Sequence, residues 1–152
     1  MEESLTNLEI IKAAIDKPFT KVQAGAMNPL ALAYIGDGIF SDAVRKYLIG
    51  CGHQNVNFMT KTSVKYVRAS AQSLVIHTLI PELTEEEHRI VKRGRNTSSQ
   101  VPKNAKASDY RYATGFEALI GYLHLSGASS RLEQLLLKSI DIINQQLDSK
   151  KQ

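Results

Sequence analysis

Apolar residues recur at helical spacing along nearly the whole chain, and no stretch has the strict alternation expected of a half-buried strand. This pattern predicts an all-α fold, a helical bundle. A linker around Pro18 and Gly25 separates the first predicted helix from the second. The predicted helices span residues 5–15, about 29–49, about 58–79, 84–94, 108–125 and about 130–147.

Several predicted helix ends carry residues that usually cap or break helices. Thr84 and Glu87 have the spacing of a capping box, in which each side chain bonds the other residue's backbone N–H. Ser108 is the predicted N-cap of the fifth helix, and Gly94 is predicted to close the fourth. The polar segment 94–107 has too few apolar residues to pack, so it is predicted to be a mobile loop. The third helix is predicted to bury Val64, Val67, Ala71, Leu74, Val75 and Thr78.

The segment LALAYIGDGIFSDAV, residues 30–44, places Asp37 between two glycines in an otherwise apolar stretch. Asp-Gly is also a hairpin signal, but the flanking residues do not alternate, and Asn28 followed by Pro29 is a favourable helix start. One helix with two internal glycines is therefore predicted, at about 1 kcal/mol for each glycine relative to alanine. Small residues around Asp37 would let a second helix or a ligand approach closely. The apolar positions assigned to this helix are Leu30, Tyr34, Ile35, Ile39, Val44 and Leu48.

A second acid, Glu117, interrupts the apolar segment YRYATGFEALIGYLHL, with Gly121 one turn away. Taken alone, each acid is explained more simply as a solvated side chain. Acids are rarely buried unless they are paired with a cation or a metal. Two helices that each present one acid on a face of small residues can cross closely and share a divalent ion. Oxygen ligands suit Mg²⁺, so Asp37 and Glu117 are the predicted metal ligands.

The distribution of charge adds a second feature. The chain has 19 basic and 15 acidic residues and a net charge of +4, yet no acid occurs in residues 88–106 or in residues 43–81. A charge stripe is usually only a solvated face, but two acid-free basic zones favour a phosphate-binding surface. The candidate phosphate contacts are Lys61, Lys65 and Arg68, at i, i+4 and i+7 of one predicted helix, and Lys92, Arg93, Arg95 and Lys103.

Length and composition limit the classes that need be considered. With 152 residues, 43% of them apolar, the chain is predicted to be one domain, residues 1–152, with a core over about 27–147. No apolar run approaches a membrane span, and no signal-peptide pattern opens the sequence. The single cysteine, Cys51, excludes an internal disulfide and fits a reducing cytoplasm.

Two segments resemble the ribonuclease III family. LAYIGDGIF resembles the family's signature helix, and TGFEALIGYLHL is similar to its second catalytic segment. Together with KRGRN, these segments most resemble the Mini-III subgroup of the family. The resemblance extends over about residues 27–147. The resemblance implies a ribonuclease III-type helical domain and a Mg²⁺-dependent endoribonuclease that cuts double-stranded RNA, leaving 5′-phosphate and 3′-hydroxyl ends. It implies that Asp37 and Glu117 are the catalytic, metal-binding residues.

The resemblance also implies partners. It implies a homodimer whose two sites face one duplex, the paired ends of precursor 23S ribosomal RNA as substrate, and a ribosomal protein as a further partner. The family's separate RNA-binding domain does not follow the last predicted helix, as expected of Mini-III. The larger enzymes carry acids where this chain has Ala33 and Thr114, which leaves open whether one or two metals bind.

Two other interpretations remain open at this stage. One is a catalytically silent, ribosome-associated RNA-binding module with the same fold, suggested by Ala33 and Thr114. The other is a structural helical adaptor whose basic loop is merely solvated.

Overall fold

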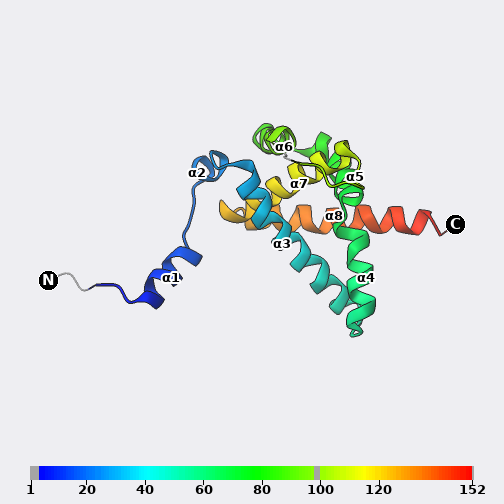
Figure 1. Cartoon of the computed structure of the whole chain (residues 1–152), viewed down its shortest axis with the longest axis horizontal. Helices are drawn as coiled ribbons and strands as arrows, with labels where there is room; N and C mark the ends of the chain where they lie inside the picture. Colours follow the sequence, from blue (N-terminus) through cyan, green and yellow to red (C-terminus); the bar gives the residue numbers. More distant parts are fainter. Residues whose placement is uncertain (1–3, 98–99, 152) are drawn as a thin grey trace.

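The computed structural model describes residues 4–97 and 100–151, and every regular element in these ranges is a helix, which confirms the all-α prediction (Figure 1). The elements are α1 (Asn7–Ile15), α2 (Lys21–Gly25), α3 (Pro29–Gly50), α4 (Val56–Val67), α5 (Ala69–Leu79), the 3₁₀ turn η1 (Ile80–Glu82), α6 (Glu85–Thr97), α7 (Ala107–Leu125) and α8 (Ser129–Ser149). No helix in these ranges is both long enough and apolar enough to cross a membrane.

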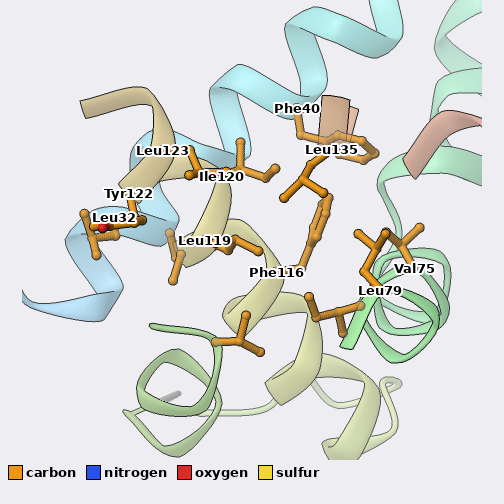
Figure 2. Close-up of a cluster of buried hydrophobic side chains, with 14 of the residues drawn as sticks. Leu32, Phe40, Val75, Leu79, Phe116, Leu119, Ile120, Tyr122, Leu123 and Leu135 are labelled. Atoms are coloured by element: carbon orange, nitrogen blue, oxygen red, sulfur yellow. The ribbon is translucent and has the colours of Figure 1, made fainter. Parts of the chain in front are cut away.

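Helix α7 is the centre of the bundle. It buries residues on every side, and α3, α5, α6 and α8 all pack against it (Figure 1). The core lies where these helices meet, with Phe40 from α3 edge-on to Phe116 from α7 at a ring separation of 5.1 Å (Figure 2). Leu79 of α5 and Leu135 of α8 close the cluster. A helix buried all round explains why the α7 segment is apolar with so little periodicity.

Two glycines bring α3 and α7 into backbone contact. A Cβ atom on Gly36 would lie 1.8 Å from the carbonyl oxygen of Glu117, and one on Gly121 would lie 1.9 Å from that of Leu32. Neither position can hold a side chain while the helices stay this close. The predicted close crossing is therefore present. Only Gly36 takes part from the Gly-Asp-Gly sequence, since Gly38 has open space beside it.

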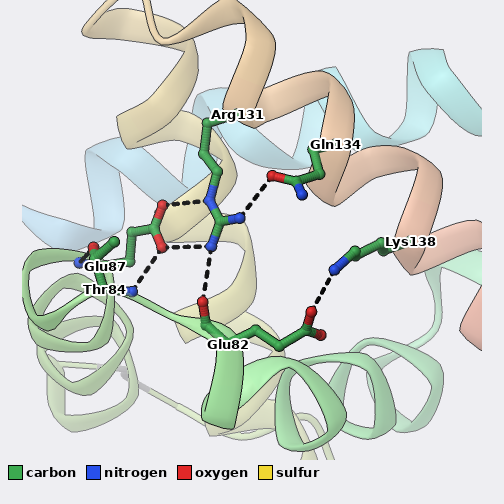
Figure 3. Close-up of polar contacts among 6 residues, drawn as sticks. All are labelled: Glu82, Thr84, Glu87, Arg131, Gln134 and Lys138. Atoms are coloured by element: carbon green, nitrogen blue, oxygen red, sulfur yellow. Dashed lines mark hydrogen bonds and ion pairs between the residues drawn. The ribbon is translucent and has the colours of Figure 1, made fainter.

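A buried ion pair ties α6 to α8. Arg131 donates two hydrogen bonds of 2.8 Å to the Glu87 carboxylate and a third to the carbonyl of Glu82 (Figure 3). Glu87 also accepts from the backbone N–H of Thr84, and the Thr84 hydroxyl accepts from that of Glu87, so the predicted capping box is confirmed. Burial would raise the pKa of Glu87, but the bonds from Arg131 and Thr84 outweigh it and hold the pKa below its usual value.

The single helix predicted over 58–79 is wrong. Arg68 has extended backbone, with ψ of 155°, and divides the segment into α4 and α5. Lys61, Lys65 and Arg68 are consequently not one stripe of one helix. Of the predicted apolar face, Val64 and Thr78 are exposed, so their assignment to it was wrong. Ala71 and Val75 are buried in α5, which packs on α7. Apolar spacing runs through the junction unchanged, so periodicity could not reveal the change of direction.

Three predicted boundaries also differ from the structure. Gly94 does not end α6, which continues to Thr97, because Gly94 packs against Gly115 of α7, where a Cβ would lie 2.9 Å from the Gly115 Cα. The loop is thereby shortened to residues 98–106, of which 98–99 lie outside the described residues. Ser108 is not the N-cap of α7, since Lys106 holds that position without a side-chain cap. The end near Gly127, with φ of +73°, is confirmed.

The N-terminal part departs from prediction too. The expected linker contains α2, which Thr20 and Gln23 start with a capping box. Helix α1 buries none of its residues and stands apart from the bundle (Figure 1). Within α3, Tyr34 is 84% exposed, so it was wrongly assigned to the apolar face. The residues that α3 buries are Pro29, Leu32, Ala33, Gly36, Phe40, Val44 and Leu48.

The contact at Gly36 predicts opposite effects for two similar substitutions. Gly36→Ala should destabilise the protein by about 3 kcal/mol or more, because the added methyl group meets backbone atoms of α7 that cannot turn aside. Gly38→Ala, the matched control in the same helix, should stabilise it by about 1 kcal/mol, because it adds helix propensity in open space. Urea unfolding of both variants measures this, and equal stability would contradict the close crossing.

Candidate active site

The close crossing brings the two predicted acids together. Asp37 follows Gly36 on α3, and Gly36 lies against the backbone of Glu117 on α7. The side chains of Asp37 and Glu117 share a hydrogen bond, although their helices are far apart in sequence. Asp37 is exposed, while Glu117 is partly buried. The two acids that the sequence singled out therefore lie together at the crossing, and their binding of a metal stays a prediction.

The surroundings of Glu117 favour its neutral form. Burial, followed by the hydrogen bond and the charge of Asp37, raises the pKa of Glu117 to about 9. At neutral pH the metal-free protein therefore keeps a proton on Glu117, which allows two acids to lie side by side. A shift of this size, caused by burial beside a second acid, is typical of functional sites.

The donor set fits a hard divalent cation. The crossing offers carboxylate oxygens from Asp37 and Glu117, and Mg²⁺ commonly takes one or two protein carboxylates and keeps several waters. A third oxygen, Oε1 of Gln72, is buried and has no hydrogen-bond partner among the described residues. Within those residues no group of three or more His, Cys, Asp or Glu side chains is placed to hold a metal. The arrangement is thus suited to one ion held by two carboxylates.

Gln72 is a site residue that the sequence prediction missed. It lies on α5 and is 98% buried, and the interaction with its amide lowers the pKa of Glu117. The available signal was a glutamine three residues before Val75, a position that shares the buried face of an apolar helix. A long polar side chain in such a position must find partners in the core.

Most of the predicted phosphate contacts lie on the surface. Lys61 and Lys65 are exposed on α4, and Arg68 is exposed at the junction between α4 and α5. Gln72, whose amide interacts with Glu117, also donates to the carbonyl of Val67 beside this junction. Of this basic group, Arg68 therefore lies at the junction that Gln72 contacts, and phosphate binding by the group stays a prediction.

The second basic group is less uniform. Lys92 and Lys103 are exposed, but the Arg93 guanidinium donates to the carbonyls of Gly25 and Met27, at the end of α2 and before α3. Those carbonyls have no helical donor of their own, so Arg93 fastens the turn between α2 and α3 onto α6.

Arg95 contacts the ring and hydroxyl of Tyr112. With Arg111, which the sequence analysis did not select, it lines a polar hollow of about 660 Å³ at the start of α7. An arginine at this position gave no signal in the sequence, because only the packing of α6 on α7 brings it beside Arg95.

Comparisons with known proteins agree with this geometry. The family described as Ribonuclease III domain matches residues 30–128. The Mini-ribonuclease 3 of Thermoanaerobacter sp. (strain X514) is 44% identical over 127 residues, which cover 83% of this chain and 89% of that protein. The Mini-ribonuclease 3 of Brevibacillus brevis is 48% identical over 117 residues, 76% of this chain and 87% of that protein.

A solved structure has the same fold. The crystal structure of a Fusobacterium nucleatum protein is similar with a TM-score of 0.72 at 28% identity, covering 81% of this chain and 98% of that one. The matched family segment contains both acids and both glycines of the crossing. The chain therefore belongs to the Mini-ribonuclease 3 group of the ribonuclease III family of endoribonucleases.

Proposed function

We propose that this endoribonuclease cuts double-stranded RNA in a Mg²⁺-dependent reaction at the Asp37–Glu117 pair. The observation that carries the proposal is the sharing of a hydrogen bond by two acids, one from each of two helices in backbone contact. Without a cation such a pair must keep a proton, because two acids repel once both are ionised. A divalent cation removes that conflict.

In the proposed mechanism Asp37 and Glu117 would hold the ion, with Glu117 releasing its proton to solvent so that it could bind as a carboxylate. A bound Mg²⁺ supplies charge stabilisation for hydrolysis of a phosphodiester. Asp37 is exposed, so its carboxylate is open to a substrate that approaches from solvent. Glu117 is more enclosed, so it is held in place by the surrounding helices.

Duplex RNA is recognised mainly through its shape, its 2′-hydroxyls and its phosphates. We propose that Lys61, Lys65 and Arg68 contact phosphates near the acids, and that Lys92, Arg95 and Lys103 do so farther along the duplex. Arg93 is a weaker candidate, because its guanidinium already bonds two carbonyls.

The finer assignments rest on the family. We propose a homodimer, because two-fold symmetry suits antiparallel strands and because Tyr34, one turn from Asp37, exposes a large aromatic side chain. The substrate proposed is the paired ends of precursor 23S ribosomal RNA, in the cytoplasm, with a ribosomal protein as a further partner. The free, exposed Cys51 suits a reducing compartment.

A silent RNA-binding module is the second candidate, because Ala33 and Thr114 stand where larger family members have acids. Both are buried, at 8% and 7% exposed, and the Thr114 hydroxyl donates to the carbonyl of Tyr110. The two remaining acids are suited to one ion, which is enough for metal-assisted hydrolysis.

Cleavage of a labelled RNA duplex, with Mg²⁺ or with a chelator, tests the proposal. Asp37→Asn and Glu117→Gln should each lower cleavage at least about a hundredfold, since they remove charge that a hard cation needs while keeping shape. Asp42→Asn, an exposed acid of α3 paired with Lys46, is the matched control and should cut normally. Duplex binding in chelator should persist in all three.

The possible results separate the interpretations. Wild-type turnover in either site variant would remove that residue from the mechanism. Binding without cutting by the unmodified protein supports the silent module, and neither binding nor cutting supports an adaptor. Sedimentation of the same samples tests assembly, because a fully active monomer is incompatible with the homodimer.

The raised pKa of Glu117 predicts that replacing this residue by glutamine stabilises the metal-free protein, by an amount that depends on pH. In metal-free protein, unfolded Glu117 loses its proton near pH 4.5 but the folded residue keeps it to about 9, so wild-type stability falls as pH rises between these values. The stability of Glu117→Gln does not fall with pH in this way. The variant should therefore be more stable than wild type by about 1–3 kcal/mol at pH 8, and no more stable than wild type at pH 4.5. Denaturant unfolding in chelator measures it, with Glu133→Gln on the exposed face of α8 as control. A pH-independent difference would contradict the raised pKa.

The basic residues of α4 predict the salt dependence of RNA binding. Each phosphate contact releases counterions, so the double variant Lys61→Ala/Lys65→Ala should reduce the slope of log affinity against log salt by up to about two units. Lys138→Ala is the control, because its ammonium is already paired with Glu82 (Figure 3). Titration of a duplex in chelator at several salt concentrations gives the slopes, and equal slopes would mean that the α4 lysines are only solvated.

A further inference from the structure

Helix α1 has an apolar face that the described part of its own chain leaves uncovered. The helix starts with a complete capping box, yet it buries none of its residues and lies apart from the bundle (Figure 1). An isolated helix of nine residues is marginal in water, so a stable one needs a surface to pack against. The large apolar side chains that this segment exposes by more than half are Leu5, Leu8, Ile10, Ile11 and Ile15.

The apolar side chains of α1 form a stripe along one side of the helix. Leu8, Ile11 and Ile15 follow one another at i, i+3 and i+7, which is the spacing of one helix face. Lys12, four residues after Leu8, adds a positive charge to the same face, whereas Ala13 lies on the opposite face. The surface that covers this stripe should therefore be an apolar groove with acidic residues at its edge.

The groove between α3 and α8 fits this description. It has a volume of about 620 Å³, and the residues that line it include Tyr47 of α3 and Leu136 of α8. Leu137, also in the groove, is 63% exposed. Glu133 and Asp141, four residues before and after Leu137, place two exposed carboxylates in the same row of α8. The groove thus combines uncovered apolar side chains with negative charge.

We propose that α1 of one copy of the chain docks in the α3–α8 groove of a second copy. The stripe of Leu8, Ile11 and Ile15 then packs on the apolar lining, and Lys12 lies near the acids of the groove. The inference rests on the proposed homodimer and names a surface that holds it together. Each copy supplies one α1 and one groove, so the exchange closes after two copies.

The connection between α1 and α2 favours a second copy over the same chain. It is only five residues long, residues 16–20. Phe19 packs against the core, and Pro18 before it has a fixed φ, so the start of the connection is anchored and stiff. This arrangement directs α1 away from its own bundle (Figure 1).

Two pairs of full-length variants test the interface. Ile11→Glu places a charge in the stripe of α1, and Ala13→Glu places the same charge on the opposite face of the same helix. Leu137→Glu places a charge in the groove, and Gln134→Glu is its control, on the same helix but outside the groove. All four positions are exposed, so the subunit fold should persist, which circular dichroism checks.

Fluorescence-detected sedimentation over a range of dilutions gives the dissociation constant of each dimer. We expect Ile11→Glu and Leu137→Glu each to weaken the dimer at least about tenfold, because each places an unpaired charge in an apolar contact. Both controls should dimerise like wild type. An unchanged dissociation constant in either interface variant overturns the inference, as does an equal loss in its control.

Cross-linking identifies the copy that supplies the helix. Protein with Ile11→Cys is mixed with protein with Leu137→Cys, both also carrying Cys51→Ser to remove the free native thiol. A short bismaleimide reagent should join the two chains into a product of twice the chain mass. In a chain that carries both substitutions, cross-linking within single chains at every dilution would show that α1 occupies its own groove and would overturn the inference.

The wild-type protein separates the two proposals. If it sediments as a monomer while cutting RNA fully, the proposed homodimer fails, and the inference fails with it. If it is a dimer and both interface variants dimerise normally, the homodimer stands and only the role of α1 is wrong.

Discussion

The backbone contact between α3 and α7 is the constraint on which the rest of the molecule depends. At Gly36 and Gly121 the two helices approach so closely that no side chain fits between them. A contact this close fixes both the separation and the rotation of the helices, since sliding by one residue would place a side chain against backbone. The edge-on packing of Phe40 on Phe116 continues the same interface. Asp37, adjacent to one of these glycines, therefore has a defined position relative to Glu117.

Two partly or fully buried glutamates show how the protein uses the same side chain in opposite ways. Glu87 has a guanidinium and a capping threonine as partners, so its pKa is lowered and it stays ionised (Figure 3). Glu117 has burial and a second acid, so its pKa is raised. The first arrangement is complete and ties two helices together. The second would carry its charge only with a cation beside it, which is why we propose it as a metal site.

Arg68, one of the candidate phosphate contacts, lies at the α4–α5 junction. The extended residue Arg68 turns the chain so that α5 packs on α7 while α4 runs along the far end of α3 (Figure 1). Lys61 and Lys65 therefore lie on α4, and the carbonyl of its last residue, Val67, accepts a hydrogen bond from Gln72.

The sequence by itself determined the helical class, the extent of α3 with its internal glycines, the capping box at Thr84, and the two acids of the site. Most of these features are local. The acids were found because an acid and a glycine are unfavourable inside an apolar helix unless another helix packs closely against them. Only the tertiary structure decided the break at Arg68, the continuation of α6 past Gly94, and the backbone carbonyls to which Gln72 and Arg93 donate. Periodicity indicates which face of a helix is apolar but not where the chain turns. The hydrogen-bond partner of a buried polar side chain is a backbone group, distant in sequence, that packing leaves without a partner, so it cannot be read from local sequence.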